Sequence, residues 1–296
     1  MEASILSIVM PCLNGMPHIR DAIESVKSAI PTGNVEIVVA DGGSTDGTLE
    51  FLRNAPVTLI EGPDRSLYEG LNKAIASARG EYLVWLNSDD LLLGGMTELW
   101  RKTQESLADI GTGEAEIAVD GKPNWKSDHH AREMSTASLL FAVPTINSRI
   151  ISTGLLREAG PFRCDIGLGA DRDMMLKLFG LSRKRIFLNS AVYRYNSHSG
   201  SRTMGATWKS YRDVHDANLQ MVRVLHEEMT GNGDRELIAA FELVSTIARA
   251  RAEFFNGAPA ASLGSVLRAF RNHPSPRTWL RGKSFYLDNR GRGSGW

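Results

Sequence analysis

The sequence predicts an α/β protein in which a mostly parallel sheet is flanked by helices and followed by a C-terminal helical extension. Over the first ninety residues, short β-rich runs alternate with segments of helical periodicity, as they do in βαβ units. The fourth run ends in a polar cluster at 87–90, and open α/β sheets bind ligands at such strand ends. Beyond Ala206 the apolar residues recur at helical spacing.

The elements of the first ninety residues follow from this alternation. Strands are expected at 5–10, 35–40, 57–60 and 81–86, where apolar and β-branched residues are concentrated. Between them, Pro17 can open one helix, residues 44–47 can cap a short second one, and Gly80 can end a third that begins at 67. The order of strands and helices therefore favours parallel pairing.

The remaining two thirds of the chain are less regular. The expected elements are β-like runs at 116–119 and 137–143, helices at 153–159 and 171–179, strands at 186–188 and 191–195, and two helical segments after 206 that are separated by a break at 231–233. We therefore place a boundary near residue 205, with an α/β domain at 1–205 and a helical extension at 206–296.

Composition excludes several classes of protein. The 34 basic and 34 acidic side chains cancel, so no overall field attracts nucleic acid. The two cysteines, Cys12 and Cys164, are too few for the disulfide framework of a secreted scaffold. No leader or bilayer-length apolar window is visible. We expect a cytoplasmic protein whose contact with a membrane, if it has one, is peripheral at the inner face.

Asp89 and Asp90 are the first candidates for chemistry, because they directly follow the fourth strand. Hard divalent cations prefer carboxylate oxygens, and manganese also accepts imidazole. Such a cation would stabilise the charge that gathers on a diphosphate leaving group when a sugar bond breaks. The residues alone leave a second reading open, in which the two aspartates form a solvated turn or cap the next helix.

Three motifs carry a resemblance to a known family. Residues 4–14, 36–48 and 86–90 stand in the order and at the separations found in the family 2 glycosyltransferases, which have the GT-A (Rossmann-like) fold. The resemblance covers about two thirds of the chain, and the helical tail from Ala206 lies outside it. It implies that residues up to about 100 hold a nucleotide and that residues 101–205 shape the acceptor site.

The resemblance also implies roles for particular residues. Pro11 and Cys12 would lie beneath the nucleobase, Asp41 would accept a hydrogen bond from it, and Asn87 would contact the ribose. The full set of nucleotide-binding candidates is Pro11, Cys12, Asn14, Asp41, Asp64, Arg65, Asn87, Ser88 and Arg202. Asp89 would be the main metal ligand. Other readings remain: Asp41 as a turn residue, and Asp64 and Arg65 as surface residues of a helix.

Asp171, His198 and Arg202 complete the implied site. Asp171 resembles the general base that removes the proton of an acceptor hydroxyl, although it could also cap the helix that follows. His198 would complete the coordination of the cation, and Arg202 would neutralise phosphate charge by a forked contact. A loop histidine can equally be a solvated surface residue.

Three positions depart from the family pattern. Gly42 stands where many relatives carry a second aspartate, Asn87 replaces an acid, and Ala170 replaces the glutamate that often precedes the base. An amide at position 87 can still hydrogen-bond a ribose hydroxyl. The lost charge leaves nucleotide affinity and metal preference open.

The sequence therefore predicts a glycosyltransferase that moves a sugar from a nucleotide-diphosphate sugar, with a UDP-type donor favoured, to a glycan or lipid-linked acceptor. We expect an inverting reaction, a divalent cation (Mn²⁺ or Mg²⁺) and a role in bacterial surface polysaccharide or glycan assembly. The alternatives are an inactive nucleotide-sugar or glycan-binding relative and a nucleotidyltransferase, although the latter's glycine-rich phosphate loop is missing after the first strand. The helical tail could support a homodimer, rest on a membrane, or pack on its own domain.

Overall fold

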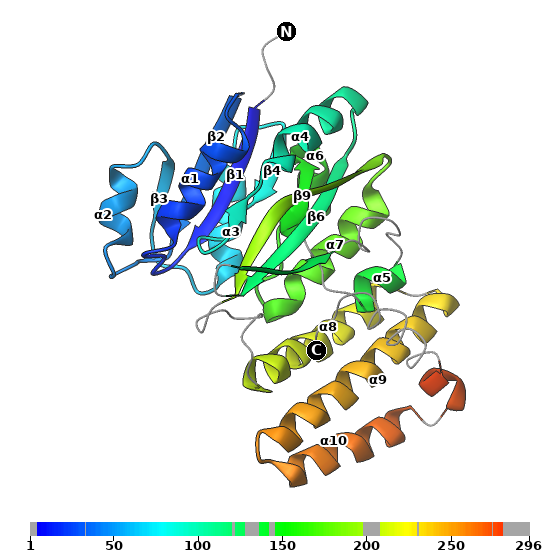
Figure 1. Cartoon of the computed structure of the whole chain (residues 1–296). Helices are drawn as coiled ribbons and strands as arrows, with labels where there is room; N and C mark the ends of the chain where they lie inside the picture. Colours follow the sequence, from blue (N-terminus) through cyan, green and yellow to red (C-terminus); the bar gives the residue numbers. More distant parts are fainter. Residues whose placement is uncertain are drawn as a thin grey trace. The chain divides into compact units, whose positions relative to one another are not determined.

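The structure is a computed structural model that describes residues 5–32, 34–119, 122–127, 136–141, 146–197, 208–229, 231–273 and 275–280 (Figure 1). The chain forms two compact units. The first, called the sheet unit, comprises Met1–Met134, Pro144–Cys164 and Met174–Asn196, and the second, called the helical unit, comprises Ser135–Val143, Asp165–Asp173 and Ser197–Trp296.

Four parallel strands form the first half of the sheet, in the order β3-β2-β1-β4. They are β1 (Ile5–Cys12), β2 (Asn34–Asp41), β3 (Thr58–Glu61) and β4 (Tyr82–Trp85), and the helices between them are α1 (Ile19–Ala29), α2 (Thr48–Arg53) and α3 (Leu67–Ser77). These are the strands and helices expected from the alternation of the first ninety residues, so the predicted α/β class is confirmed.

The second half of the sheet contains antiparallel pairs, so the sheet as a whole is mixed. Its strands are β5 (Leu91–Leu92), β6 (Ile110–Val119), β7 (Lys122–Ser127), β8 (Arg149–Ser152) and β9 (Arg185–Ser197). Strand β8 runs antiparallel to β4 and β6, and β5 runs antiparallel to β9. The two strands expected at 186–188 and 191–195 are parts of the single strand β9.

The core of the sheet unit lies between β1 and the helices that cover it. Leu6, Ile8 and Met10 of β1 are fully buried together with Ile19 and Ile23 of α1. The apolar residues of α1 recur four residues apart and therefore share the face that meets the sheet. The unit also contains α4 (Gly95–Ser106), the 3-10 turn at Ile146–Ser148 and α6 (Thr153–Ala159).

The helical unit is built on α8 (Trp208–Glu228), α9 (Asn232–Phe255) and α10 (Pro259–Asn272), with α5 (Thr136–Phe141) and the 3-10 turn at Gly167–Gly169. Helix α7 (Ala170–Leu181) begins in this unit and continues in the sheet unit. Within the described residues, no helix combines the length and the apolar character needed to cross a bilayer.

The strand expected at 137–143 is wrong, because Thr136–Phe141 forms the helix α5. Leu139 and Leu140 are buried, and the ring of Phe141 meets Phe241 of α9 edge-on at 5.6 Å. A short apolar run suits a buried strand and a buried helix equally well. The contact with α9, one hundred residues away, decides between them.

Candidate active site

Three loops of the sheet unit meet at the carboxyl ends of parallel strands. Cys12 at the end of β1 pairs with Asp41 at the end of β2, and Val9 of β1 pairs with Trp85 of β4. The loops that follow these strands hold most of the predicted nucleotide-binding residues. The pairing register therefore brings them to one edge of the sheet, where ligands of open α/β sheets bind.

The loop after β1 is fixed to the loop after β2 by hydrogen bonds. The Asn14 backbone nitrogen donates to Ser44 Oγ at 2.7 Å, and the Thr45 nitrogen donates to Asn14 Oδ1 at 2.9 Å. The Gly15 nitrogen donates to Thr48 Oγ1 at 2.9 Å. Asn14, predicted to bind nucleotide, therefore also braces the two loops against each other.

Asp41 shapes the loop that follows it. Its side chain is almost fully buried, and Oδ1 accepts hydrogen bonds from the nitrogens of Gly43 and Ser44 at 2.9 and 2.7 Å. Its Oδ2 accepts a third bond from Ser44 Oγ at 2.6 Å. This geometry matches the turn-residue reading, and contact with a nucleobase stays a prediction.

Asp64 lies beside two glycines that make room for it. It pairs with the ammonium group of Lys73, which also donates to the Pro63 carbonyl at 3.0 Å. A Cβ atom at Gly70 would lie 2.6 Å from Asp64 Oδ2, and one at Gly42 would lie 3.4 Å from it. An aspartate at position 42 would add a second negative charge beside Asp64, which gives a physical reason for the glycine.

Arg65 differs from Asp64 in its exposure. Its side chain is 93% exposed and pairs with Glu69 of α3 at 3.1 Å. Helix α3 begins after Ser66, whose hydroxyl accepts a hydrogen bond from the Glu69 nitrogen. Arg65 thus occupies the surface position that the alternative reading described, and a phosphate contact stays a prediction.

The turn after β4 is organised around Asp90. Asp90 Oδ2 accepts hydrogen bonds from Tyr193 Oη and Asn87 Nδ2, both at 2.8 Å, and Oδ1 accepts one from the Asn196 nitrogen at 2.8 Å. Asn196 Nδ2 also donates to the carbonyl of Asp89 at 2.8 Å. Asp90 is buried, while Asp89 is partly exposed.

The same network explains why an amide stands at position 87. Burial, and secondly the negative charge of Asp89, raises the pKa of Asp90 to about 7. An aspartate at position 87 would place a further carboxylate against Asp90, whereas the Asn87 amide donates a hydrogen bond to it. Sequence reasoning missed Tyr193 and Asn196, because nothing near them in the sequence indicates a partner in the 87–90 turn.

Removal of the Tyr193 hydroxyl should destabilise this turn. The side chain is fully buried, and its oxygen also accepts a hydrogen bond from the Asn87 nitrogen at 3.2 Å. We expect Tyr193→Phe to lower the free energy of unfolding by about 1–3 kcal/mol, because the buried Asp90 carboxylate loses a hydrogen-bond donor. Urea denaturation measures this. Tyr195→Phe is the matched control, since the Tyr195 hydroxyl bonds Asn147 from a half-buried position and should cost less.

The two cysteines should differ sharply in reactivity. Burial, and secondly the charge of Asp41, raises the pKa of the Cys12 thiol to about 12, so it stays protonated and unreactive at neutral pH. Cys164 is exposed. We expect iodoacetamide to modify Cys164 in the folded protein and Cys12 only after denaturation. The Cys164→Ser variant should therefore resist modification, and rapid labelling of that variant would contradict the burial of Cys12.

Asp171 lies in the helical unit, inside the first turn of α7 and partly exposed. Its neighbour Arg172 is buried and fixes this turn. Arg172 Nη1 donates to Asn218 Oδ1 at 2.7 Å, and its Nε donates to the Leu139 carbonyl at 2.9 Å. Its guanidinium lies 5.4 Å from the ring centre of Phe241. The sequence did not reveal this set of contacts, which fastens the predicted base to α5, α8 and α9.

His198 and Arg202 lie outside the described residues, so their predicted roles are not tested. Within the described part of the chain, no three His, Cys, Asp or Glu side chains come together as a metal site. Of the predicted metal ligands, the structure therefore places Asp89 alone.

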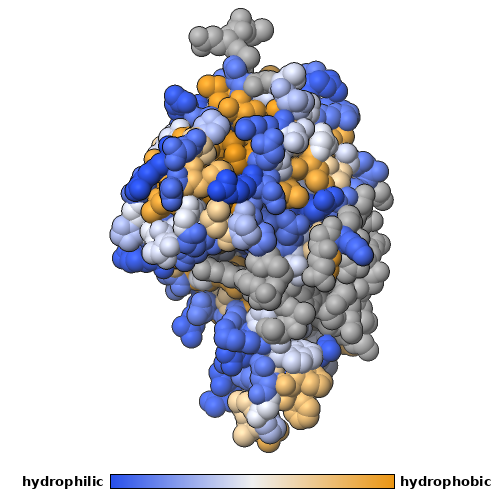
Figure 2. All heavy atoms as spheres, turned by 60° about the vertical axis from the view of Figure 1, so that its left-hand side comes forward, coloured by the Kyte–Doolittle hydropathy of each residue, from blue (hydrophilic) through white to orange (hydrophobic). Residues whose placement is uncertain are grey.

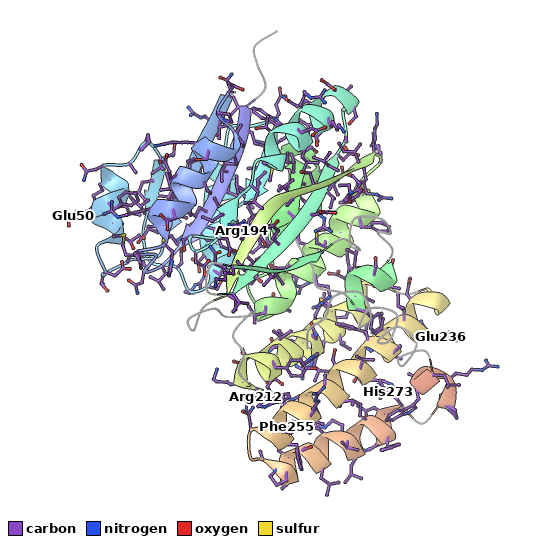
Figure 3. All side chains as sticks on the ribbon, viewed as in Figure 1. Glu50, Arg194, Arg212, Glu236, Phe255 and His273 are labelled. Atoms are coloured by element: carbon purple, nitrogen blue, oxygen red, sulfur yellow. The ribbon has the colours of Figure 1, made fainter. Side chains whose placement is uncertain are left out.

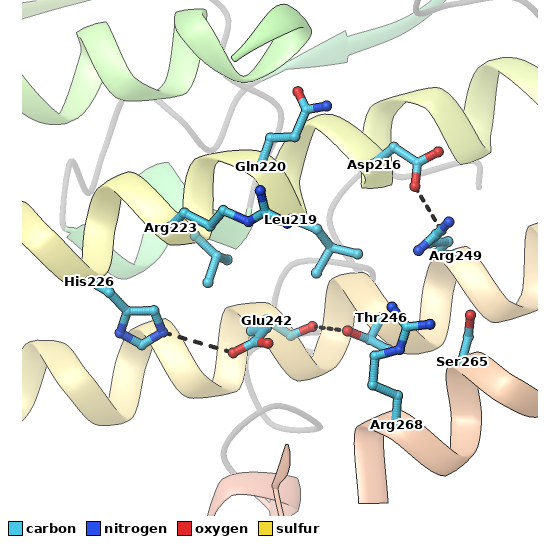
Figure 4. Close-up of a pocket in the computed structure, with 11 residues that line it drawn as sticks. Asp216, Leu219, Gln220, Arg223, His226, Glu242, Thr246, Arg249, Ser265 and Arg268 are labelled. Carbon is cyan, nitrogen blue, oxygen red and sulfur yellow. Dashed lines mark hydrogen bonds and ion pairs between the residues drawn. The ribbon is translucent and has the colours of Figure 1, made fainter. Parts of the chain in front are cut away.

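The helical unit contains a pocket of about 460 Å³ between α8, α9 and α10 (Figure 4). Its ionic side chains largely pair with one another: Arg249 Nε lies 2.7 Å from Asp216, and His226 lies 3.9 Å from Glu242. None of the predicted site residues lines it. The pocket therefore does not include the predicted base Asp171, which belongs to the same unit.

Two solved structures share the architecture of the chain. S. aureus TarS 1-349 in complex with UDP-GlcNAc matches with a TM-score of 0.61 at 16% identity, covering 96% of this chain and 88% of that one. Mannosyltransferase PcManGT from Pyrobaculum calidifontis in complex with GDP-Man and Mn²⁺ matches with a TM-score of 0.58 at 19% identity, covering 98% and 87%. These likenesses establish the fold, which is that of the GT-A glycosyltransferase class.

The family follows from the sequence match. The profile of glycosyl transferase family 2 matches residues 7–158, more than half of the 296 residues, and the chain belongs to this family. Glycosyltransferase GlyA of Streptococcus pneumoniae is 26% identical over 250 residues, which are 74% of this chain and 34% of GlyA. The chain thus spans about a third of the length of GlyA. The resemblance first drawn from three short motifs is confirmed.

Proposed function

We propose that the chain transfers a sugar from a nucleotide-diphosphate sugar to an acceptor hydroxyl. The observation that carries this proposal is the arrangement of the turn after β4, where Asp90 is buried in a hydrogen-bond network and Asp89 is left partly exposed. This turn lies at the sheet edge beside the braced loops after β1 and β2. A diphosphate bound there would lie beside the partly exposed Asp89, which we propose as a cation ligand.

A divalent cation, Mn²⁺ or Mg²⁺, fits the chemistry of this turn. Asp89 offers a hard oxygen ligand, and its main chain is held in place by Asn196. We propose His198, two residues after Asn196 in the sequence, as a second ligand and Arg202 as a phosphate contact. When bound, the cation would stabilise the negative charge that develops on the leaving diphosphate. PcManGT, which shares the fold, is described in complex with Mn²⁺.

The remaining roles belong to the chain's own residues. The proposed nucleotide contacts are Pro11, Cys12, Asn14, Asp41, Asp64, Arg65, Asn87 and Ser88. Asp171 would accept the proton of the acceptor hydroxyl as that oxygen attacks the sugar carbon and the diphosphate leaves. One base and one in-line displacement give inversion at that carbon. Residues 1–100 would hold the donor and residues 101–205 would shape the acceptor site.

We propose a UDP-type donor and a glycan or lipid-linked acceptor, in the assembly of a bacterial surface polysaccharide or glycan on the cytoplasmic side. TarS, which shares the fold, is described in complex with UDP-GlcNAc. The Asn87 amide suits a ribose hydroxyl as well as it suits Asp90, since its oxygen can accept a hydrogen bond while its nitrogen donates.

A thermal-shift screen tests the proposal directly. UDP, GDP, their sugar conjugates and ATP are each added with and without Mn²⁺, because a ligand that binds the folded state raises its stability by mass action. We expect a UDP compound to raise the melting temperature only with the cation, and the matching donor to be hydrolysed slowly. Binding without hydrolysis or transfer would indicate an inactive relative, and a response to ATP alone would favour a nucleotidyltransferase.

A further inference from the structure

Helix α10 packs on α9 along one face. Ser265 and Ala269 are buried, and Ser265 Oγ donates to Glu253 Oε2 of α9 at 2.7 Å. Residues four apart lie on the same face of a helix, so this face is the one that packs on α9. At the C-terminal end of α10, the ring of Phe270 stacks on that of Trp279 with 4.7 Å between the ring centres.

A second face of α10 exposes large apolar side chains. Leu263 and Leu267 are each 60% exposed and Phe270 is 58% exposed. Their spacing of four and three residues aligns them as one stripe along the helix. Phe254 and Phe255 at the end of α9 are also more than half exposed, and Figure 2 shows apolar residues at its lower end, where α9 and α10 meet. An exposed apolar surface of this kind marks an interaction site.

The charge of the sequence segment that contains this stripe is strongly one-sided. Residues 259–296 contain seven basic and one acidic side chain, a net charge of +6, whereas residues 1–258 contain 27 basic and 33 acidic side chains. No acidic residue occurs between Glu253 and Asp288. Arg268 and Arg271 of α10 and Arg277 beyond it are exposed. The neutral total of the chain thus conceals a cationic end.

We propose that α10 docks on the surface of an anionic phospholipid bilayer. The stripe of Leu263, Leu267 and Phe270 would enter the boundary between headgroups and acyl chains, and the arginines would meet lipid phosphates. Charge complementarity favours this occupant over a second copy, because pairing two such faces would bring two cationic surfaces together. The inference goes beyond the proposed transfer reaction and does not require it.

Vesicle flotation with the full chain tests the proposal. At low salt we expect binding to vesicles of phosphatidylcholine with phosphatidylglycerol, and little binding to phosphatidylcholine alone. Leu267→Asp should weaken binding about tenfold or more, since it removes an aliphatic side chain that the bilayer would bury. Arg271→Gln should weaken it about fivefold, equivalent to about 1 kcal/mol per basic side chain near the surface. Salt should weaken binding further.

Leu107→Asp is the matched control, because Leu107 is 80% exposed at the end of α4 in the sheet unit and gains the same charge. This variant should bind vesicles like the unaltered chain. An equal loss in the control, or no binding of the unaltered chain at low salt, would overturn the proposal. A dimer in light scattering that Leu267→Asp dissociates, without vesicle binding, would assign the stripe to a subunit interface instead.

Two measurements keep the outcome clear. Circular dichroism checks that each variant is folded. If Leu267→Asp is unfolded, vesicle binding is compared for Leu263→Gln and Arg271→Gln instead. Donor hydrolysis in solution should not change in any of these variants. Vesicle binding without donor hydrolysis would support the docking surface and contradict the proposed transfer reaction. Donor hydrolysis without vesicle binding would support the reaction and contradict the docking surface.

Discussion

Asp89→Ala is expected to abolish cation-dependent turnover of the donor while the sheet unit stays folded. The variant removes the partly exposed carboxylate of the turn and leaves the hydrogen bonds of the buried Asp90 in place. Loss of a cation that stabilises the leaving group costs several kcal/mol in the transition state. We expect turnover to fall about 10³-fold or more, since each 1.36 kcal/mol is tenfold in rate.

The measurement is donor hydrolysis and transfer over a manganese titration, together with the thermal shift caused by nucleotide. Asp89→Ala should lose the cation-dependent part of that shift. Glu50→Ala is the control, because Glu50 is an exposed carboxylate in the first turn of α2, well out on the surface (Figure 3). Turnover within tenfold of the unaltered chain at saturating manganese would show that Asp89 does not hold the cation.

Asp171→Asn is expected to lower transfer about 10² to 10⁴-fold, the range that general bases contribute. The amide keeps the size of the side chain and its place in the first turn of α7, which Arg172 holds against Asn218 and Leu139. It cannot accept the proton of the acceptor hydroxyl. Donor affinity should not change, because the base acts on the acceptor.

Single-turnover transfer and the nucleotide thermal shift separate this variant from Asp89→Ala. In Asp171→Asn the rate of single-turnover transfer should fall while the nucleotide thermal shift is retained. In Asp89→Ala both should decrease. Asp213→Asn is the control, since Asp213 pairs with Lys209 on the surface of α8 and such pairs contribute about 0–1 kcal/mol. Unchanged transfer by Asp171→Asn would remove this residue from the role of base.

The parallel half of the sheet was predictable because its signals are local. Apolar and β-branched residues are concentrated in each strand there, and the helices between them carry apolar residues at helical spacing. The segment at 137–143 has no such local signal. Its helical state depends on the contact of Phe141 with Phe241, and no window of the sequence contains both residues.

The sequence singled out the residues of the 87–90 turn but did not indicate how they are hydrogen-bonded. The sequence places Asp89 and Asp90 side by side and offers no way to tell the ligand from the structural residue. Tyr193 and Asn196, more than one hundred residues later, hydrogen-bond the buried Asp90 carboxylate, whereas Asp89 is partly exposed. In the same way Asn87, a departure from the family pattern, has its explanation in the charge of Asp90 three residues away.

The bracing between the loops after β1 and β2 limits how this protein can be re-engineered. Asn14 and Gly15 of one loop hydrogen-bond directly to Ser44, Thr45 and Thr48 of the other. A chimera that exchanges 41–48 alone would leave unpaired backbone groups in the other loop. The two segments form a single module, and a productive graft has to carry both.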